Sequence, residues 1–302
     1  MQQKGRALAL LAVLALVAAA CGGDGGSDEK AAVSVFGAFT ATEADAVQQV
    51  INDELNAVKD YEATYEGSES FEEQVKIRVE GGNPPDVALY PQPGAVVEQA
   101  EAGNAIALED LGFDIAALEA TYGPYLLSLG EYNGKHYGLP TNTNLKSLVW
   151  YPKAAFDAAG YAVPTTWDEL IALSDQIVAD GGTPWCLGIG SDAATGWPAT
   201  DWMEDIMLRT AGADAYDLWV TNDLKFNSPE VKRAAEYLGQ IAFTEGYVLG
   251  GAEQVPAIDF RDSPDPMFQD PPACWLHRQA SFIPQFFDSP DGSDLIAGED
   301  YS

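Results

Sequence analysis

Short apolar runs alternate with helical segments between residues 32 and 90, and this alternation restricts the choice of fold most strongly. Ala32–Gly37 predicts a short buried strand, and Val87–Tyr90 predicts another before prolines end it. Between them lies an apolar stripe at helical spacing, formed by Val47, Val50, Ile51, Leu55 and Val58. Strands that alternate with helices are typical of α/β architecture. We therefore predict an α/β fold with a mainly parallel sheet.

Several local signals fix where other elements begin. Thr166–Glu169 forms a capping box, and Ser228 followed by a proline predicts a second helix start. Thr42 is expected to cap the first helix. Val75–Val79 fits either a half-buried strand or the end of a helix begun near Ser70. Pro184–Gly190 predicts a buried strand that enters a glycine-rich loop.

Residues 1–20 have the composition of a secretory signal. Two positive charges precede Ala7–Ala20, an almost wholly apolar run that is too short to span a bilayer. Cys21 follows small residues as in a bacterial lipobox, although Ala18 stands where leucine is usual. Residues 21–31 are rich in glycine and suit a flexible tether. We expect an exported protein lipidated on Cys21; the alternative is an ordinary cleaved signal followed by an accidental cysteine.

The charge and the cysteines support export. The 302 residues carry a formal net charge of −32, which argues against nucleic acid or an anionic membrane surface as a partner. Beyond Cys21 only Cys186 and Cys274 remain, and we expect them to form a disulfide in an oxidising compartment. With His136 and His277 they lack the close spacing of a zinc site, so no metal is predicted. No nucleotide or dinucleotide loop motif points to a cofactor.

Tryptophans beside glycine and proline suggest a sugar-binding surface. Trp197 and Trp202 stand in the predicted loop 190–202, where an aromatic face is able to stack on a sugar ring. The alternative for each is packing in the core, which is the interpretation adopted for Trp167 and Trp219 because both stand in helical stretches.

Several segments together resemble extracellular solute-binding proteins of the maltose-binding type. Each motif alone is weak, but their order and spacing match over nearly all of the chain from about residue 32. The general motifs are Pro85–Val87, Tyr132–Pro140, Leu148–Tyr151 and Pro164–Leu170. Those that resemble more narrowly the α-glucoside-binding branch are Trp202–Gly212, Tyr216–Trp219 and Cys274–Phe282.

The resemblance implies a periplasmic-binding-protein-like fold of two α/β lobes with a hinge between them. It divides the chain into a signal (1–20), a tether (21–31), a first lobe (32–140 and 286–302) and a second lobe (141–285) whose C-terminal part is missing. It also implies a monomer that captures a carbohydrate, such as an α-glucoside or oligosaccharide. The partner is then the membrane permease of an ATP-driven (ABC) importer, and the lipid is the only contact with the membrane.

Candidate ligand-binding residues follow the predicted strands or stand near the crossover between the lobes. In a parallel sheet, ligands meet the carboxyl ends of the strands. The set is Thr40, Thr42, Glu43, Tyr90, Gln92, Asn142, Asn144, Trp197, Asp201, Trp202 and Phe282. Alternatives remain open for some: Thr42 as a helix cap, the asparagines as turn residues, and Asp201 as the cap of a helix beginning at Trp202.

Two other functions compete with sugar capture. A secreted glycoside hydrolase needs a pair of carboxylates, and 47 acidic residues do not exclude one, although no catalytic motif points to it. The same fold is also able to bind a non-sugar solute such as a polyamine, a peptide or a metal. Aromatic residues in loops and few cationic candidates favour a neutral, hydroxyl-rich ligand, and we expect binding without catalysis.

Overall fold

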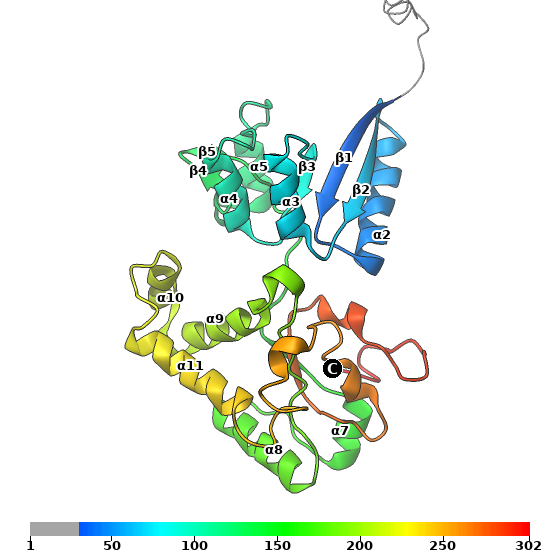
Figure 1. The fold of residues 1–302 in the computed structure, drawn as a ribbon, viewed down its shortest axis with the longest axis vertical. Coiled ribbons are helices and arrows are strands. Elements are labelled where there is room, and N and C mark those ends of the chain that lie inside the picture. The colour runs from blue at the N-terminus through cyan, green and yellow to red at the C-terminus, as the bar shows by residue number, and fades with distance from the viewer. Residues whose placement is uncertain (1–29) are drawn as a thin grey trace, which may run out of the picture.

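The computed structural model describes residues 30–302, which form two lobes one above the other (Figure 1). The predicted signal, Cys21 and all but the last residues of the predicted tether lie outside the described residues. Within residues 30–302 no helix has the length and apolar character needed to cross a membrane.

The first lobe is built on a three-stranded parallel sheet. Its strands are β1 (Ala31–Gly37), β2 (Tyr61–Gly67) and β3 (Val87–Leu89), in the order β2-β1-β3. The parallel sheet and the strands β1 and β3 confirm the prediction. The strand β2 was not predicted.

Helices cover both faces of this sheet because neighbouring residues of β1 point to opposite sides. Val35 packs with Ile51 at the end of α2 (Ala41–Val50), whereas Phe36 packs with Phe71 of α3 (Phe71–Glu80). The remaining elements of the lobe are the π-helix η2 (Ile51–Asn56), α4 (Pro93–Glu101), α5 (Ile115–Tyr122), α6 (Pro124–Ser128), β4 (Glu131–Tyr132) and β5 (Lys135–His136).

Two local expectations for this lobe are resolved. Val75–Val79 lies inside α3, so the helical alternative is correct. The prediction that Thr42 caps the first helix is wrong, because the cap position belongs to Thr40 and Thr42 lies in the first turn of α2. The Thr40 side chain makes no capping hydrogen bond, so α2 begins without a side-chain cap.

In the second lobe, helices surround a short antiparallel pair of strands. β6 (Leu148–Trp150) pairs with β7 (His277–Gln279). Helices and short 3₁₀ turns around them are α7 (Lys153–Ala159), α8 (Trp167–Ala179), η3 (Asp192–Ala194), α9 (Trp197–Ala211), α10 (Ala213–Val220), α11 (Pro229–Ala242), η4 (Val255–Ala257), η5 (Asp265–Phe268) and η6 (Ile283–Phe286).

Both predicted helix starts in this lobe are confirmed. Thr166 Oγ1 accepts a hydrogen bond from the Glu169 amide at 3.2 Å, and the Glu169 carboxylate accepts from the Thr166 amide in return. Ser228 Oγ accepts from the Val231 amide at 3.4 Å. The predicted strand Pro184–Gly190 is not continuous, since only its ends, at Trp185 and Gly190, form isolated bridges.

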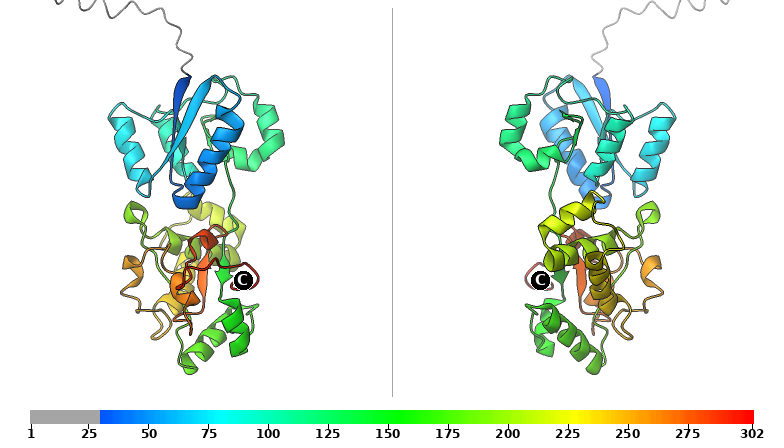
Figure 2. Two further views of the ribbon diagram at one scale, coloured as in Figure 1. Left: turned by 90° about the vertical axis from the view of Figure 1, so that its right-hand side faces the viewer. Right: turned by 90° about the vertical axis from the view of Figure 1, so that its left-hand side faces the viewer.

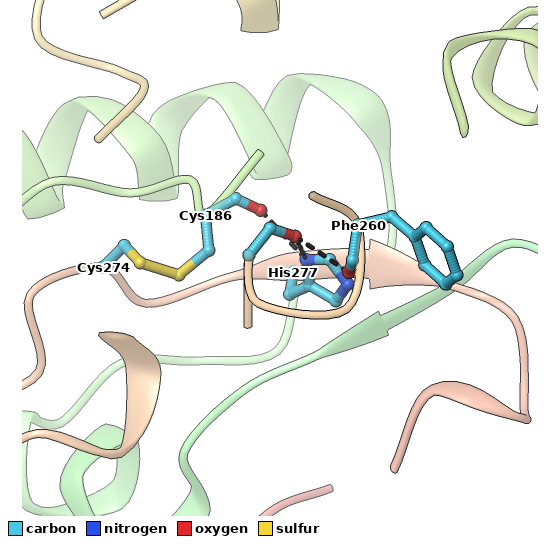
Figure 3. Close-up of a disulfide and its surroundings, with 5 residues drawn as sticks. Cys186, Phe260, Cys274 and His277 are labelled. Atoms are coloured by element: carbon cyan, nitrogen blue, oxygen red, sulfur yellow. Dashed lines mark hydrogen bonds between the residues drawn. A yellow bond between two sulfur atoms is a disulfide. The ribbon is translucent and has the colours of Figure 1, made fainter. Parts of the chain in front are cut away.

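The predicted disulfide between Cys186 and Cys274 is confirmed. Their Cα atoms are 5.4 Å apart, and the bond joins two segments separated by 88 positions (Figure 3). His277 lies beside it, with Nδ1 2.9 Å from the Cys186 carbonyl oxygen. Because a carbonyl only accepts, Nδ1 carries the proton. The bond and its aromatic neighbours form a core separate from the larger apolar core of the lobe.

The C-terminal residues were expected to return to the first lobe, but they contact the second lobe instead. The Tyr151 amide donates to the Ser302 carbonyl at 3.1 Å, and the ring of Phe287 lies 5.8 Å from that of Trp150. The packing of Phe287 and Tyr301 on the ring of Trp150 is the contact that places this segment beside β6. Figure 2 shows this segment in the lower lobe, while the extended residues 138–147 lead from the first lobe into the second.

Candidate functional site

A cavity of about 660 Å³ lies between the two lobes. Its first-lobe wall follows the carboxyl ends of β1 and β3, where a parallel sheet presents groups to a ligand. Its second-lobe wall comes from η3, the start of α9 and the loops that hold Phe260 and Phe282. The crossing residues supply part of the boundary, through residues 138–144 and Lys146.

Three predicted residues of the first lobe line the cavity: Glu43, Tyr90 and Gln92. Burial raises the pKa of Glu43, and a hydrogen bond with Gln285 of the second lobe opposes this shift. Burial likewise raises the pKa of the Tyr90 hydroxyl, whose ring packs edge-on against Phe71 at 5.2 Å. The wall therefore combines an acid, an amide and an aromatic ring.

Thr40 and Thr42, also predicted here, do not line the cavity. Thr40 stands at the cap position of α2. Thr42 Oγ1 lies 3.4 Å from Gln285 Oε1 and donates to it across the two lobes. Thr42 is therefore placed to hold the lobes together rather than to contact the contents of the cavity.

Aromatic rings dominate the second-lobe wall. Trp197 lies 4.9 Å from Phe260 and 6.0 Å from Phe282, between ring centroids, and all three line the cavity. Phe286 packs behind them, 6.0 Å from Phe260. Such clusters of edge-on rings hold one another rigidly and leave apolar faces for stacking.

The start of α9 separates the two tryptophans that the sequence placed together in a loop. The helix begins at Trp197, after Gly196 turns the chain at a φ of +109°, and not at Trp202 as expected. Trp197 thus lies at the cavity. Trp202 is 2% exposed and packs edge-on against Trp185 at 5.4 Å, in the lobe's main core beside a second, smaller cavity.

Asp201 lies in the second turn of α9, so it is not the cap of that helix, and it does not line the cavity. Its carboxylate accepts from Lys146 Nζ at 2.7 Å. Lys146 itself lines the cavity, and its ammonium lies 5.3 Å from the ring centroid of Trp197. Asp201 therefore positions a cation beside the aromatic wall.

Both predicted asparagines of the crossing segment, Asn142 and Asn144, line the cavity. Asn144 Oδ1 lies 3.4 Å from Ser281 Oγ and accepts from it. The crossing segment is thereby attached to the segment that follows β7.

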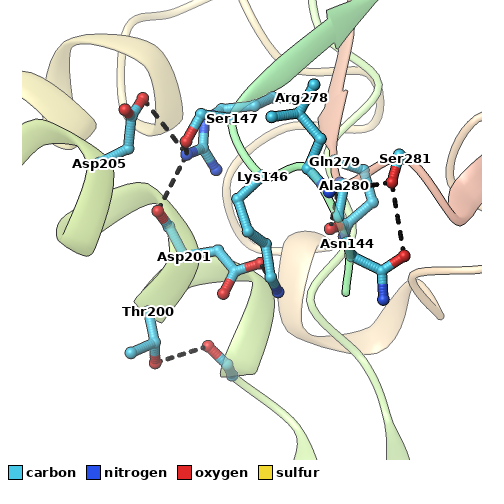
Figure 4. Close-up of polar contacts among 12 residues, drawn as sticks. Asn144, Lys146, Ser147, Thr200, Asp201, Asp205, Arg278, Gln279, Ala280 and Ser281 are labelled. Atoms are coloured by element: carbon cyan, nitrogen blue, oxygen red, sulfur yellow. Dashed lines mark hydrogen bonds and ion pairs between the residues drawn. The ribbon is translucent and has the colours of Figure 1, made fainter. Parts of the chain in front are cut away.

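A buried arginine fixes this wall from behind (Figure 4). Arg278 Nη2 donates to Ser147 Oγ at 3.0 Å and to the Asp201 carbonyl at 2.9 Å, and it lies 3.3 Å from the carboxylate of Asp205. Its guanidinium also stacks over Trp202 at 4.6 Å. These contacts hold α9 to β6 and β7, which sets the position of the helix start at the cavity.

Sequence reasoning missed several cavity residues. They include two aromatic residues, two acidic residues and two cationic residues: Phe39, Phe260, Glu69, Glu72, Lys146 and Arg261. The available signal was an aromatic beside a cation, at Phe260–Arg261, in a loop rich in aspartate and proline. Within residues 30–302 no group of three or more His, Cys, Asp or Glu side chains is arranged to hold a metal ion.

Comparisons with known proteins agree with this architecture. Residues 40–256 match the bacterial extracellular solute-binding protein family. An alpha-glucosides-binding periplasmic protein, AglE, of Rhizobium meliloti is 46% identical over 244 residues, which cover 79% of this chain and 52% of the relative. An osmoprotective compounds-binding protein, GgtB, of Synechocystis is 38% identical over 288 residues, which cover 95% of this chain and 68% of the relative.

The fold recurs in solved structures. One, from work on xylan utilization by the thermophilic bacterium Caldanaerobius polysaccharolyticus, has a TM-score of 0.72 at 20% identity and covers 90% of this chain and 66% of that one. Two α/β lobes around a cavity are the architecture of a hinged ligand-binding protein. The chain belongs to the bacterial extracellular solute-binding protein family. It spans about half the length of the Rhizobium meliloti relative (52%).

Proposed function

We propose that this protein captures a carbohydrate for an ABC importer and delivers it to the membrane permease. The observation that carries the proposal is the cavity between the lobes, whose second-lobe wall is mainly aromatic and whose first-lobe wall adds amide and carboxyl groups. A sugar has an apolar ring face and a rim of hydroxyl groups, so it requires both kinds of wall. The name of AglE, an alpha-glucosides-binding protein, supports this class of ligand, whereas GgtB is named for osmoprotective compounds and leaves the class open.

Binding proceeds by closure of the lobes on the solute. The ring face stacks on Trp197 and Phe282 of the second lobe, while hydroxyl groups bond to Glu43 and Gln92 of the first lobe. Neither wall alone satisfies the ligand, so its binding energy favours the conformation in which both walls touch it. The crossing residues 138–147 absorb the change in angle.

The charges of the cavity disfavour an anionic solute. Lys146 and Arg261 line it, but each already pairs with an aspartate, Asp201 and Asp259 respectively. The carboxylates that line the first-lobe wall, Glu43, Glu69 and Glu72, then leave an excess of negative charge. An anionic sugar is disfavoured there by like-charge repulsion.

A thermal-shift screen against mono- and oligosaccharides, polyamines, peptides and metal ions tests the ligand class. A ligand that binds only the folded state stabilises it by RT ln(1 + [L]/Kd), so Tm rises with ligand concentration and rises further for a tighter ligand. We expect a response to one or more α-glucosides or related oligosaccharides and none to polyamines. A shift with polyamines, peptides or metal ions and no shift with any sugar would sink the sugar assignment and leave the fold.

The proposal includes binding without catalysis. Incubation with nitrophenyl glycosides should quench or shift tryptophan fluorescence without release of nitrophenol. Turnover that is lost when Glu43 or Glu69 is changed to glutamine would instead identify a glycoside hydrolase.

We further propose that the protein acts as a monomer outside the cytoplasm, held at the cell membrane by lipid on Cys21. The lipid and the tether would keep the loaded receptor close to its permease. Metabolic labelling with a palmitate analogue tests the anchor. Wild type should incorporate the label and Cys21→Ala should not; equal labelling of both, or of neither, would remove the anchor from the proposal.

A further inference from the structure

Glu69 and Arg261 approach each other from opposite lobes. Glu69 precedes α3 in the first lobe, Arg261 follows η4 in the second, and both line the cavity. Glu69 Oε1 lies 3.9 Å from Arg261 Nη2. A hydrogen bond between these atoms needs a distance of roughly 2.7–3.2 Å. The two charges are therefore close enough to attract but too far apart to satisfy each other.

Arg261 is held firmly on one side and left unsatisfied on the other. Nη1 donates to both carboxylate oxygens of Asp259 at 3.1 Å, and the guanidinium stacks 4.6 Å from the ring centroid of Phe260. Nε is buried and has no hydrogen-bond partner within the part of the chain that the structure describes. Nε and Nη2 share one edge of the planar guanidinium. The edge with a missing acceptor is thus the edge nearest Glu69.

We propose that one hydroxyl group of the bound solute bridges Arg261 and Glu69, so that the pair selects a particular hydroxyl of the ligand. This inference rests on the proposed function. A hydroxyl both accepts and donates, so it takes a hydrogen bond from Arg261 Nη2 and gives one to Glu69 Oε1. Because the partners belong to different lobes, the same hydroxyl joins the two walls.

The surroundings restrict the chemistry of the bridging group. The carboxylates of Glu69 and Asp259 lie 3.9 and 3.1 Å from the Arg261 guanidinium, and that of Glu72 lines the same cavity. An anionic group is repelled by these carboxylates, and an ammonium group has no acceptor to offer the guanidinium. The rings of Phe260 and Trp197 adjoin the pair, with centroids 4.9 Å apart. A neutral cyclic sugar, with an apolar ring face beside a hydroxyl, meets both requirements.

Calorimetric titration of wild type, Glu69→Ala and Arg261→Met with the tightest-binding sugar and its series of mono-deoxy analogues tests the inference. Arg261→Met keeps the length of the side chain and removes its donors. Both variants should bind the parent sugar about tenfold more weakly, as expected for loss of a hydrogen bond to a charged group. One deoxy analogue, the same for both variants, should bind wild type about tenfold more weakly and be insensitive to either substitution.

Two controls accompany the titration. Glu66→Ala breaks the Glu66–Arg78 ion pair, which belongs to the first lobe alone, and it should leave the affinity unchanged. Arg261→Lys keeps the positive charge at this position. Thermal unfolding of each variant checks that loss of binding does not follow from misfolding.

Other outcomes overturn the inference in distinguishable ways. If both variants bind the parent sugar and every analogue more weakly by the same factor, the pair stabilises the contact between the lobes and does not recognise one hydroxyl group. If neither variant changes affinity while wild type binds sugar, the bridging hydroxyl does not exist. If wild type binds no sugar, the proposed function fails and takes this inference with it.

Discussion

Trp197 and Trp202 are five positions apart, yet they occupy different environments. Five residues of an α-helix turn through about 500°, which leaves the two side chains about 140° apart around the axis. Because α9 begins at Trp197, one ring lies at the cavity and the other is buried against Trp185. The sequence predicted both as candidates for ligand contact. A Gly-Trp-Pro segment is a weak signal for the start of a helix, and unless the start of α9 is known, the sequence does not show which of the two rings faces the cavity.

Trp197 is the residue on which the stacking proposal depends most. Trp197→Ala should weaken sugar binding by about 1 kcal/mol or more, roughly fivefold in Kd, because a stacked ring face is lost. Trp219→Ala is the matched control, since Trp219 lines neither cavity. Fluorescence or calorimetric titration measures both. Equal affinity in wild type and Trp197→Ala would place the stacking surface elsewhere.

His277 should make stability fall on mild acidification. It is fully buried, and burial lowers its pKa to about 4 against 6.5 in the unfolded chain. The stabilising effect of keeping it neutral is complete above pH 6.5 and is lost as the pH falls towards 4, by roughly 3 kcal/mol. The free energy of unfolding should therefore decline less between pH 7 and 4 in His277→Asn than in wild type. Equal declines in the free energy of unfolding of wild type and His277→Asn would show that protonation of His277 does not cause the loss of stability.

At the scale of elements, predictability follows the strength of the local signal. β1 and β3 are apolar, and the starts of α8 and α11 have capping side chains, so each was predicted and confirmed. β2 was missed because its sequence, Tyr-Glu-Ala-Thr-Tyr-Glu-Gly, contains two acids. Only Ala63 and Tyr65 of this strand are buried. Its extended conformation depends on backbone pairing with β1, which the sequence of β2 alone does not show. Likewise, Glu69 and Arg261 meet only through the arrangement of the lobes, which no local pattern encodes.

The capping box of α8 offers a test at this scale. Thr166→Ala should lower the free energy of unfolding by about 1 kcal/mol, because the Glu169 amide loses its acceptor. Thr121→Ala in α5 is an appropriate control, since that hydroxyl only donates back to the Ala117 carbonyl on an exposed surface. Denaturant unfolding compares the two. Similar losses in both variants would show that the cap contributes nothing specific.

The disulfide stabilises the second lobe by joining segments 88 positions apart. Replacing both Cys186 and Cys274 with serine should reduce the free energy of unfolding by about 2–4 kcal/mol. Reducing agent should destabilise wild type by a similar amount and leave the double variant unchanged. A variant as stable as the oxidised wild type would mean that the surrounding aromatic core holds these segments by itself.

At the scale of the molecule, the described residues 30–302 form two separately packed lobes joined by residues 138–147, and few hydrogen bonds or ion pairs among these residues link the lobes directly. Thr42 to Gln285 at 3.4 Å and Glu69 to Arg261 at 3.9 Å are weak interactions of this kind. The resemblance of scattered motifs predicted the two lobes, and the family match agrees with it. It did not predict that residues 286–302 lie on the second lobe, because that contact depends on Phe287 and Tyr301 reaching Trp150.

The central claim is that a sugar binds between the lobes and draws them together. Small-angle scattering of wild type and Trp197→Ala, with and without the tightest-binding sugar from the screen, tests it most directly. Saturating sugar should reduce the radius of gyration of wild type, and the variant should need a severalfold higher concentration for the same change. Saturable sugar binding with no change in the radius of gyration of wild type would contradict closure.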